Sequence, residues 1–399
     1  MSTTTDLLTI DEALRLVLDR VRPLEAEGVP LETAAGRVLA EDARSAVDLP
    51  PFHASAMDGF ALRAGDAPAT LPIVARIAAG RPAPRPLEAG EAMAIATGGV
   101  VPDGADSVVP IEDVEEDDDT VTVPGSVGKG DNVRPRAGDL RAGDTVVVAG
   151  TRLGPAHVGA LAAAGVASVR CHRVPRVVVV VTGSELCAPG EPLGPGEIYD
   201  ANGFILTTQV RSAGAEVERL PPVKDDAEAT RAAIERGLAA DVLVTTGGVS
   251  VGVYDLVRAV EAELGVEEVF WRVAVRPGKP VAFGVRERTL VFGLPGNPVS
   301  SLVGFELFVR PALLALQGVA TTAPAFRPGR LAGPARRLGA RDSLLRARSR
   351  IEDGNVVLEP LTGQESHMIA QAATADALVL VPRGEGEIEA GSVVSYLAL

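Results

Sequence analysis

One glycine-rich turn and a carboxylate shortly after it have the residue types of a phosphate and metal site. The segment Thr245-Thr246-Gly247-Gly248-Val249-Ser250 follows an apolar run and is neither a Walker loop nor a GxGxxG sequence. Glycines such as Gly247 and Gly248 bring backbone N–H groups close to a phosphate, and the Ser250 hydroxyl adds a donor. A plain strand-to-helix turn fits the same residues equally well. Asp255 favours the anion site, because a carboxylate beside a phosphate loop commonly serves a divalent metal.

A second turn of this kind, Thr182-Gly183-Ser184-Glu185, follows a run of valines at 177–181. If both apolar runs are neighbouring parallel strands, their carboxyl ends meet at the sheet edge where ligands bind in doubly wound folds. Glu185 and Asp255 then converge on one crevice, and we expect them to bind Mg²⁺. On local grounds, an N-cap role for Ser184 or Glu185 stays equally open.

Cations and hydroxyls follow in two further segments. Arg276-Pro277-Gly278-Lys279-Pro280 holds two cations on a stretch stiffened by prolines, which limits the entropy lost when an anion binds. Surface cations are usually solvated, but this packaging favours an anion clamp. Asn297 and Pro298 have ordinary helix-start chemistry, and Ser300 lies where a helix N-terminus attracts anions.

Weaker candidates lie in the middle and last parts of the chain. Asp58, in the block Pro50 to Ala61, is either a functional acid or a turn residue. Arg136 follows a rigid proline and is able to contact phosphate in a bidentate way, although a structural Arg–Asp pair is equally plausible. Arg346 and the segment 362–367 offer another cation and hydroxyl. No His or Cys has metal-ligand spacing, so no zinc site is assigned.

The elements that position these residues predict a multidomain α/β plus β protein. Thr9-Ile10-Asp11-Glu12 fits a capping box before a helix that runs to Pro23, and a second helix begins at Pro155 and ends at Gly165. Valine-rich runs alternate with helical stretches such as 226–239, as in a doubly wound sheet. We expect a discontinuous helical domain (1–44 and 141–173), an inserted β-rich domain (45–140), a doubly wound α/β domain (174–323) and a C-terminal β domain (324–399).

Composition excludes several classes of protein. The formal net charge of -15 argues against nonspecific binding to nucleic acid or to an anionic membrane surface. The two cysteines, Cys171 and Cys187, are too few for a disulfide framework, and we expect buried free thiols. The N-terminus lacks a signal-peptide pattern, and no run of about 18 uncharged apolar residues occurs. We therefore expect a soluble, cytoplasmic protein.

Taken together, the ordered blocks resemble the molybdopterin molybdenumtransferase family, also called the molybdenum-insertase or gephyrin E-domain family. The resemblance covers essentially the whole chain, and its most specific blocks are 50–61, 96–98 with 104–106, 132–139, 246–252, 276–280 and 293–300. It implies a homodimer of four-domain subunits with an intersubunit active site. It also implies a reaction in which adenylated molybdopterin and molybdate give the molybdenum cofactor, with Mg²⁺ assisting and AMP released. Other cofactor-assembly proteins are then expected as partners.

The resemblance assigns roles residue by residue. At position 276, where this chain has arginine, a lysine is also typical of the family, so the charge is kept but its donors point differently. The expected catalytic residues are Asp58, Thr97, Asp139, Glu185, Asp225, Asp255 and Lys279, and the expected substrate-binding residues are Gly247, Gly248, Ser250, Arg276, Lys279, Ser300, Arg346, Ser366 and Arg136.

Two other functions compete with this one. Molybdopterin adenylyltransferases share the α/β domain with its Thr-Gly-Gly turn, but they resemble only residues 174–323. A noncatalytic cofactor-assembly scaffold is the alternative of a different class. Intact Asp58, Glu185 and Lys279 argue against a purely structural remnant, and the two further β segments favour the molybdenum-insertion step.

Overall fold

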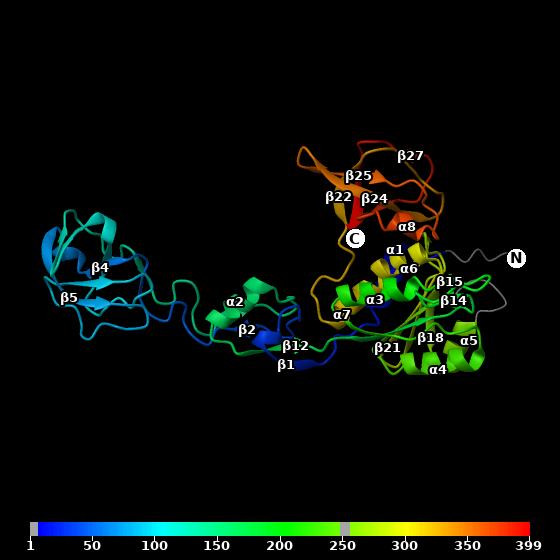
Figure 1. Cartoon of the computed structure of the whole chain (residues 1–399), viewed down its shortest axis with the longest axis horizontal. Helices are drawn as coiled ribbons and strands as arrows, with labels where there is room; N and C mark the ends of the chain where they lie inside the picture. The colour runs from blue at the N-terminus through cyan, green and yellow to red at the C-terminus, as the bar shows by residue number, and fades with distance from the viewer. Residues whose placement is uncertain (1–6, 248–255) are drawn as a thin grey trace. The chain divides into compact units, whose positions relative to one another are not determined.

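The structure, a computed structural model, describes residues 7–247 and 256–399 (Figure 1). The chain divides into two compact units: Gly28–Cys171 forms one, and Met1–Glu27 together with His172–Leu399 forms the other. The expected multidomain α/β plus β architecture is confirmed. The finer division into four domains, with boundaries near 45, 141, 174 and 324, stays a prediction.

The first helix, α1 (Ile10–Leu18), has the predicted capping box. The backbone N–H of Glu12 donates to Thr9 Oγ1 over 3.1 Å, and the backbone N–H of Thr9 donates to Glu12 Oε2 over 2.8 Å. The helix ends at Leu18, earlier than the apolar pattern suggested. Its buried residues, Leu14 and Val17 among them, share one core with the α/β sheet. α1 therefore packs with the α/β part, whereas the sequence had grouped it with 141–173.

The unit Gly28–Cys171 contains a small helical part. α2 (Pro155–Ala163) starts with proline, as predicted, and is followed by Gly165, whose φ of +76° stops the helix. Leu161 of α2 is buried with Leu39 and Cys171. The remaining elements of this part are η1 (Leu31–Thr33) and two two-stranded sheets, β1 (Ala26–Pro30) with β12 (Ser168–His172) and β2 (Ala43–Arg44) with β11 (Thr145–Val147).

The β-rich part of this unit lies within the segment predicted for it. Its six-stranded sheet has the order β7-β4-β6-β5-β9-β8, and β3 (Ala54–Ser55) pairs separately with β10 (Val133–Arg134). The acidic residues at 115–119 are exposed, and they form β8 and the turn to β9. The elements are β4 (Gly59–Leu62), η2 (Ala64–Asp66), β5 (Ala69–Ile77), β6 (Ala92–Ile95), β7 (Ser107–Pro110), η3 (Ile111–Asp113), β8 (Glu115–Asp117) and β9 (Thr120–Val123).

A doubly wound sheet forms the centre of the other unit, with strand order β16-β13-β17-β21-β20-β18. β13 (Arg176–Val181) is buried on both faces, as its continuous valines predicted: Val177 and Val179 join one core, and Val178 and Val180 join another. β16, β13, β17 and β21 are parallel, whereas β20 is antiparallel to both its neighbours. The other strands are β16 (Glu216–Arg219), β17 (Val242–Thr246), β18 (Glu267–Trp271), β20 (Ala282–Arg286) and β21 (Thr289–Leu294), with β14 (Leu186–Cys187) and β15 (Ile198–Tyr199) as a separate pair.

Helices cover both faces of this sheet (Figure 1). One face is covered by α1 with α3 (Asn202–Ser212), α6 (Pro298–Gly304), the π-helix η4 (Phe305–Val309) and α7 (Arg310–Leu316), and the other by α4 (Ala227–Gly237) and α5 (Leu256–Glu263). The helical run Pro298–Leu316 is long and apolar enough to cross a membrane, but 72% of its most apolar window is buried inside the protein. Its apolar surface thus belongs to the core of this unit.

The C-terminal part is a closed β barrel. Its strands follow the order β24-β25-β22-β28-β26, and a further pairing of β24 with β26 closes the sheet. β19 (Val275–Arg276) comes from the α/β part and pairs in parallel with β24. The elements are β22 (Arg327–Leu331), β23 (Ala335–Arg336), β24 (Asp342–Glu352), β25 (Asn355–Pro360), α8 (Ile369–Ala372), β26 (Ala377–Val381), β27 (Glu387–Ile388) and β28 (Val393–Ala398).

The two cysteines differ in exposure. Cys171 is a buried free thiol, as expected. Cys187 is also free but only partly buried, and its Sγ lies 3.6 Å from Glu191 Oε2, so the prediction that both thiols are buried was wrong for this residue. The reason is its position on the short two-stranded sheet β14–β15 rather than in the main sheet.

Candidate functional site

The carboxyl ends of β13 and β17 meet at one edge of the sheet, as the sequence predicted. The N–H of Thr182, just after β13, donates to the carbonyl of Thr246 over 3.0 Å. Gly247 has a φ of +93°, and a Cβ there would lie 2.5 Å from the carbonyl oxygen of Thr182. Only glycine allows the two turns to approach this closely. Gly248, Ser250 and Asp255, which the sequence assigned to the same site, lie outside the described residues.

Glu185 and Asp225 are brought to the same turn. The N–H of Ser184 donates to Asp225 Oδ2 over 3.2 Å, and the N–H of Asp225 donates back to Ser184 Oγ over 3.0 Å. The Glu185 carboxylate folds over Gly183, where a Cβ would lie 2.6 Å from Glu185 Oε2. Ser184 therefore joins the two segments that carry the acids, rather than capping a helix. Two exposed carboxylates border this turn.

Asn202, at the start of α3, is a site residue that sequence reasoning missed. Its Nδ2 donates to Thr246 Oγ1 over 2.9 Å and to the carbonyl of Gly296 over 2.7 Å, which links the carboxyl ends of β17 and β21. Asn202 is 8% exposed, and its Oδ1 is buried without a hydrogen-bond partner among residues 7–247 and 256–399. Nothing in the local sequence separates it from an ordinary helix-start asparagine.

A second group of predicted residues lines one cavity of about 440 Å³ between the α/β part and the barrel. Arg276, Lys279, Ser300 and Ser366 all lie on its wall, so four residues predicted from three distant segments are brought together. Gly278 has a φ of +106° and approaches the backbone of Ser300, which brings the Arg-Pro-Gly-Lys-Pro segment against α6. The remaining lining residues are Pro277, Gly278, Pro280, Pro295, Asn297, Arg341, Gln364, Glu365 and His367.

Arg341 is the cation that the sequence did not identify. It lies one residue before β24, and the parallel pairing of β19 with β24 carries it to the wall that holds Arg276. Within residues 7–247 and 256–399, the side chains of Arg276, Lys279 and Arg341 have no hydrogen bond or ion pair. One carboxylate, Glu365, also lines the cavity. Three unpaired cations against one carboxylate make this cavity suited to an anion, in a chain whose net charge is -15.

Arg346, which the sequence placed in direct contact with substrate, does not line this cavity. It is 2% exposed, and its guanidinium donates to the carbonyls of Gly363 over 2.7 Å, Met368 over 2.8 Å and Glu365 over 3.2 Å. Burial lowers the pKa of Arg346, and the nearby Glu365 opposes that shift. With its donors taken by backbone carbonyls, the side chain has little capacity left for an anion. A direct contact of Arg346 with substrate stays a prediction, while Arg341 is the arginine of this segment that lines the cavity.

The unit Gly28–Cys171 carries the remaining predicted residues. Asp58 precedes β4, and its Oδ1 accepts hydrogen bonds from the backbone N–H of Thr97 over 2.7 Å and from Thr97 Oγ1 over 3.0 Å. These two donors hold the pKa of Asp58 below its usual range, so the exposed carboxylate is ionised at neutral pH. Asp58 and Thr97 are thus joined by hydrogen bonds, while their catalytic roles stay predictions.

Arg136 and Asp139 are both exposed in the same unit, and Arg136 forms an ion pair. Arg136 Nε donates to Asp48 Oδ2 over 2.6 Å, so the structural Arg–Asp pair left open by the sequence is present, with a partner far away in the chain. The second carboxylate oxygen of Asp48 accepts from the backbone N–H of Ala142. The ion pair of Arg136 with Asp48 therefore helps to hold this loop in place.

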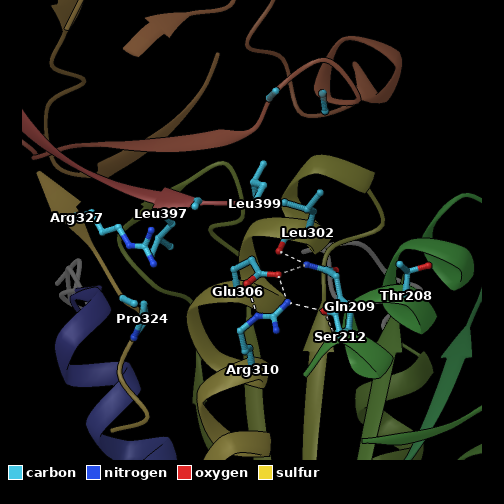
Figure 2. Close-up of a pocket in the computed structure, with 14 residues that line it drawn as sticks. Thr208, Gln209, Ser212, Leu302, Glu306, Arg310, Pro324, Arg327, Leu397 and Leu399 are labelled. Atoms are coloured by element: carbon cyan, nitrogen blue, oxygen red, sulfur yellow. Dashed lines mark hydrogen bonds and ion pairs between the residues drawn. The ribbon is translucent and has the colours of Figure 1, made fainter. Parts of the chain in front are cut away.

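Another cavity lies elsewhere and is lined by none of the predicted residues. About 600 Å³ in volume, it is walled by α3, the run α6–α7 and the end of β28 (Figure 2). A polar network on one side joins the helices: Glu306 accepts from Gln209 over 2.7 Å and from Arg310 over 2.5 and 2.9 Å, while Arg310 also donates to Ser212. The network holds α3 against η4 and α7, although Gln209 Oε1 is buried without a hydrogen-bond partner among the described residues.

A metal site is tested only in part by the described residues. No group of three or more His, Cys, Asp or Glu side chains that could hold a metal ion occurs among them. Glu185 and Asp225 nevertheless supply hard oxygen donors at one turn, and Mg²⁺ is usually held by one or two carboxylates with the rest of its shell from phosphate and water. The donor set fits Mg²⁺ and does not fit zinc.

Three family models match the chain in order. "MoeA N-terminal region (domain I and II)" matches residues 8–165, "Probable molybdopterin binding domain" matches 178–315, and "MoeA C-terminal region (domain IV)" matches 328–399. A molybdopterin molybdenumtransferase from Haemophilus influenzae is 34% identical over 396 residues, covering 98% of each chain. Molybdopterin molybdenumtransferase 2 from Mycobacterium tuberculosis is 36% identical over 406 residues, 96% of this chain and 98% of that one.

The same similarity holds in three dimensions. A crystal structure of the molybdopterin biosynthesis moeA protein from Pyrococcus horikoshii OT3 superposes with a TM-score of 0.84 at 28% identity, covering 99% of this chain and 100% of that chain. The matches in sequence and structure extend over both units and include the segments that line the anion cavity. This chain belongs to the molybdopterin molybdenumtransferase family.

Proposed function

We propose that this protein inserts molybdenum from molybdate into adenylated molybdopterin, releasing AMP and forming the molybdenum cofactor. The observation that carries the proposal is the cavity in which Arg276, Lys279 and Arg341 converge without ion-pair partners in the described chain. Its family relatives are named as molybdenumtransferases, and the family model over the α/β part is described as molybdopterin binding. The expected role in molybdenum cofactor biosynthesis thus agrees with both.

The cavity suits molybdate on chemical grounds. Molybdate is a dianion, so its removal from water is offset only where several cations and hydroxyl or amide donors converge. Lys279 is a compact charge, whereas Arg276 and Arg341 present planar sets of N–H donors. Ser300 and Ser366 add hydroxyls on the same wall. The dithiolene sulfurs that bind the metal come from the pterin substrate, so the reaction requires no cysteine of this chain.

The carboxylates at the turn after β13 suit the phosphates of the adenylated substrate. We propose that Glu185 and Asp225, with Asp255, hold Mg²⁺ beside the phosphates of the substrate. The ion would offset charge on the phosphoanhydride bond that breaks when AMP leaves. Gly247, Gly248 and Ser250 would supply backbone and hydroxyl donors to the same phosphates. The reciprocal bonds between Ser184 and Asp225 support a site at which the acids are held in place without a metal.

We also propose that the active protein is a homodimer in which the unit Gly28–Cys171 of one subunit completes the site of the other. Asp58, kept ionised by Thr97, is an exposed acid of the type needed to bind or to move a proton. Asp139 and Arg136 would face the same substrate. Other cofactor-assembly proteins as partners and a cytoplasmic location stay predictions.

Incubation of the purified protein with adenylated molybdopterin and Mg²⁺, with and without molybdate, tests the proposal. AMP release that depends on molybdate, together with reconstitution of a molybdenum-free apoenzyme, is the expected result. Tight substrate binding without release would favour a noncatalytic scaffold. Adenylation of free molybdopterin by ATP would favour the adenylyltransferase. Omission of Mg²⁺, with EDTA present, should abolish release.

Mixing two inactive variants tests the shared site. Asp58→Asn and Lys279→Met subunits should each be inactive alone, but each mixed dimer would contain one intact site. Random reassociation in equal amounts should restore about a quarter of wild-type activity, because half the dimers are mixed and one of their two sites is complete. If Asp58 acts within its own subunit, mixing restores no activity.

A further inference from the structure

The wall of the anion cavity contributed by the barrel is a loop without regular secondary structure. Residues 361–368 connect β25 to α8, and Gln364, Glu365, Ser366 and His367 of this loop all line the cavity. An irregular segment has no sheet or helix to satisfy its backbone carbonyls, so other donors must do so. The position of these carbonyls decides where the Ser366 hydroxyl lies.

The buried side chain of Arg346, on β24, supplies those donors. Its guanidinium bonds to the carbonyls of Gly363, Glu365 and Met368, which lie on both sides of Ser366 in the chain. At 2% exposure it is among the most buried large side chains of the described protein. A buried cation that bonds to neutral carbonyls rather than to a carboxylate is costly to keep, so its position calls for a specific reason.

The backbone of Arg346 strengthens the same connection. Gln364 Oε1 accepts from the N–H of Arg346 over 3.0 Å, and Gln364 Nε2 donates to its carbonyl over 2.9 Å. The N–H of Leu361 donates to that carbonyl as well, over 2.8 Å. One residue of β24 thus bonds to the start, middle and end of the loop.

The α/β part fixes the loop from the other side. Asn297 Nδ2 donates to Ser366 Oγ over 2.9 Å, and the N–H of Val299 donates to the Ser366 carbonyl over 3.1 Å. Ser366 is therefore held between Arg346 on the barrel side and residues 297–299 at the start of α6. Small displacements of the carbonyls held by Arg346 would move the hydroxyl relative to Arg341 and Lys279.

We infer that Arg346 is a positioning residue: it sets the geometry of the anion cavity by holding the 361–368 loop and does not itself contact the anion. This inference rests on the proposed function only in naming molybdate as the anion. A lysine cannot replace the arginine, because one ammonium at the end of a flexible stem does not reach three carbonyls that a planar fork reaches in fixed directions. Arg341, by contrast, is partly buried on the cavity wall and acts through its own charge.

Two readouts on the full-length protein test the inference, with Arg346→Lys compared against Arg341→Lys and against Arg348→Lys. Arg348 lies on the same strand and donates to a backbone carbonyl outside the loop, which makes it a matched control. The first readout is hydrogen exchange at the amides of 361–369. Arg346→Lys should accelerate exchange there, while Arg341→Lys and Arg348→Lys leave it at the wild-type rate.

The second readout is the steady-state dependence of AMP release on molybdate and on adenylated molybdopterin. Arg346→Lys should raise the KM for molybdate about 10- to 100-fold, with the KM for the adenylate changed less than threefold, since only one wall of one cavity is displaced. Faster exchange with unchanged KM for molybdate, or a raised KM with unchanged exchange, would overturn the inference; the second result would restore a direct contact.

The design separates this inference from the proposed function. If the wild-type protein shows no molybdate-dependent release, the proposed function fails, and the exchange readout still decides whether Arg346 holds the loop. If Arg346→Lys does not fold, Gln364→Ala provides the second variant, because it removes the side-chain bonds to the Arg346 backbone and leaves the buried cation in place. It should accelerate exchange in the same segment, and unchanged exchange would overturn the inference.

Discussion

Replacement of Arg341 by alanine is the sharpest test of the anion cavity. The guanidinium has no hydrogen bond or ion pair within the described chain, so its removal takes away a positive charge without breaking a structural bond. Arg346, five residues later, is bonded to three carbonyls and would not allow this separation. Any loss of molybdate binding in Arg341→Ala therefore reports the contact itself.

The expected size of the effect follows from the chemistry of the contact. A hydrogen bond to a charged group contributes about 1.5–3 kcal/mol to binding. Two unit charges about 4 Å apart at an effective dielectric constant of about 20 interact by about 4 kcal/mol, which is an upper bound for a solvent-connected wall. At about 1.4 kcal/mol for each factor of ten, the Kd for molybdate should rise about 10- to 100-fold.

Calorimetric titration of the purified protein with molybdate at two ionic strengths measures this change. Arg341→Lys keeps the charge and should lose less affinity than Arg341→Ala. Arg336→Ala removes an equal charge from an exposed position of β23, outside the cavity, and should bind molybdate as the wild type does. A Kd for Arg341→Ala within twofold of wild type would refute the assignment, and so would an equal loss in Arg336→Ala.

Further predictions concern stability and ionisation. Glu306→Ala should lower the free energy of unfolding by about 2–3 kcal/mol, because Arg310 and Gln209 lose their acceptor. The loss is smaller than the roughly 3–5 kcal/mol of a fully buried pair, since the pair lies beside an open cavity. A midpoint of urea unfolding equal to that of the wild type would contradict this. Thr97→Val should raise the pKa of Asp58 towards its ordinary value of about 3.9, since one of the two donors that depress it is lost. Ionised Asp58 stabilises the fold, and on acidification this contribution is lost as the pH falls through the folded-state pKa of Asp58, so in Thr97→Val the loss is complete at a higher pH than in the wild type. An unchanged titration of the Asp58 carboxyl by NMR would exclude the effect.

Local patterns predicted much of the fold. The capping box at Thr9, the proline start of α2 and the valine run of β13 are each decided by neighbouring residues, and each is present in the structure. The prolines around Lys279 likewise marked a rigid cation segment from sequence alone. Such features can be predicted from the sequence because neighbouring residues alone determine the backbone and capping chemistry.

Contacts between residues that are distant in the chain could not be predicted from the sequence. Arg341 reaches the cavity only because β19 pairs with β24, and no local feature distinguishes its arginine from the buried one at 346. Arg136 found its partner in Asp48, 88 residues away. Asn202 links two strand ends that are distant in sequence. These contacts depend on tertiary packing, which composition and spacing do not encode.

The surface on which α1 packs could not be predicted for a related reason. Its amphipathic pattern predicted a helix with one buried face, but not which surface would cover that face. Leu14 and Val17 are buried in the core shared with the α/β sheet, so the helix belongs with residues far along the chain. A helix near the N-terminus is free to pack on a later domain when the chain returns to it.

The proposed function requires that molybdate binds in the cavity formed by Arg276, Lys279 and Arg341. A crystal of the full-length protein grown with molybdate, measured at the molybdenum absorption edge, locates the metal by its anomalous scattering. We predict one strong peak inside this cavity, with the oxyanion within hydrogen-bonding distance of Arg341, Lys279 and Ser366. A peak at another site, or an empty cavity at saturating molybdate, would contradict the account.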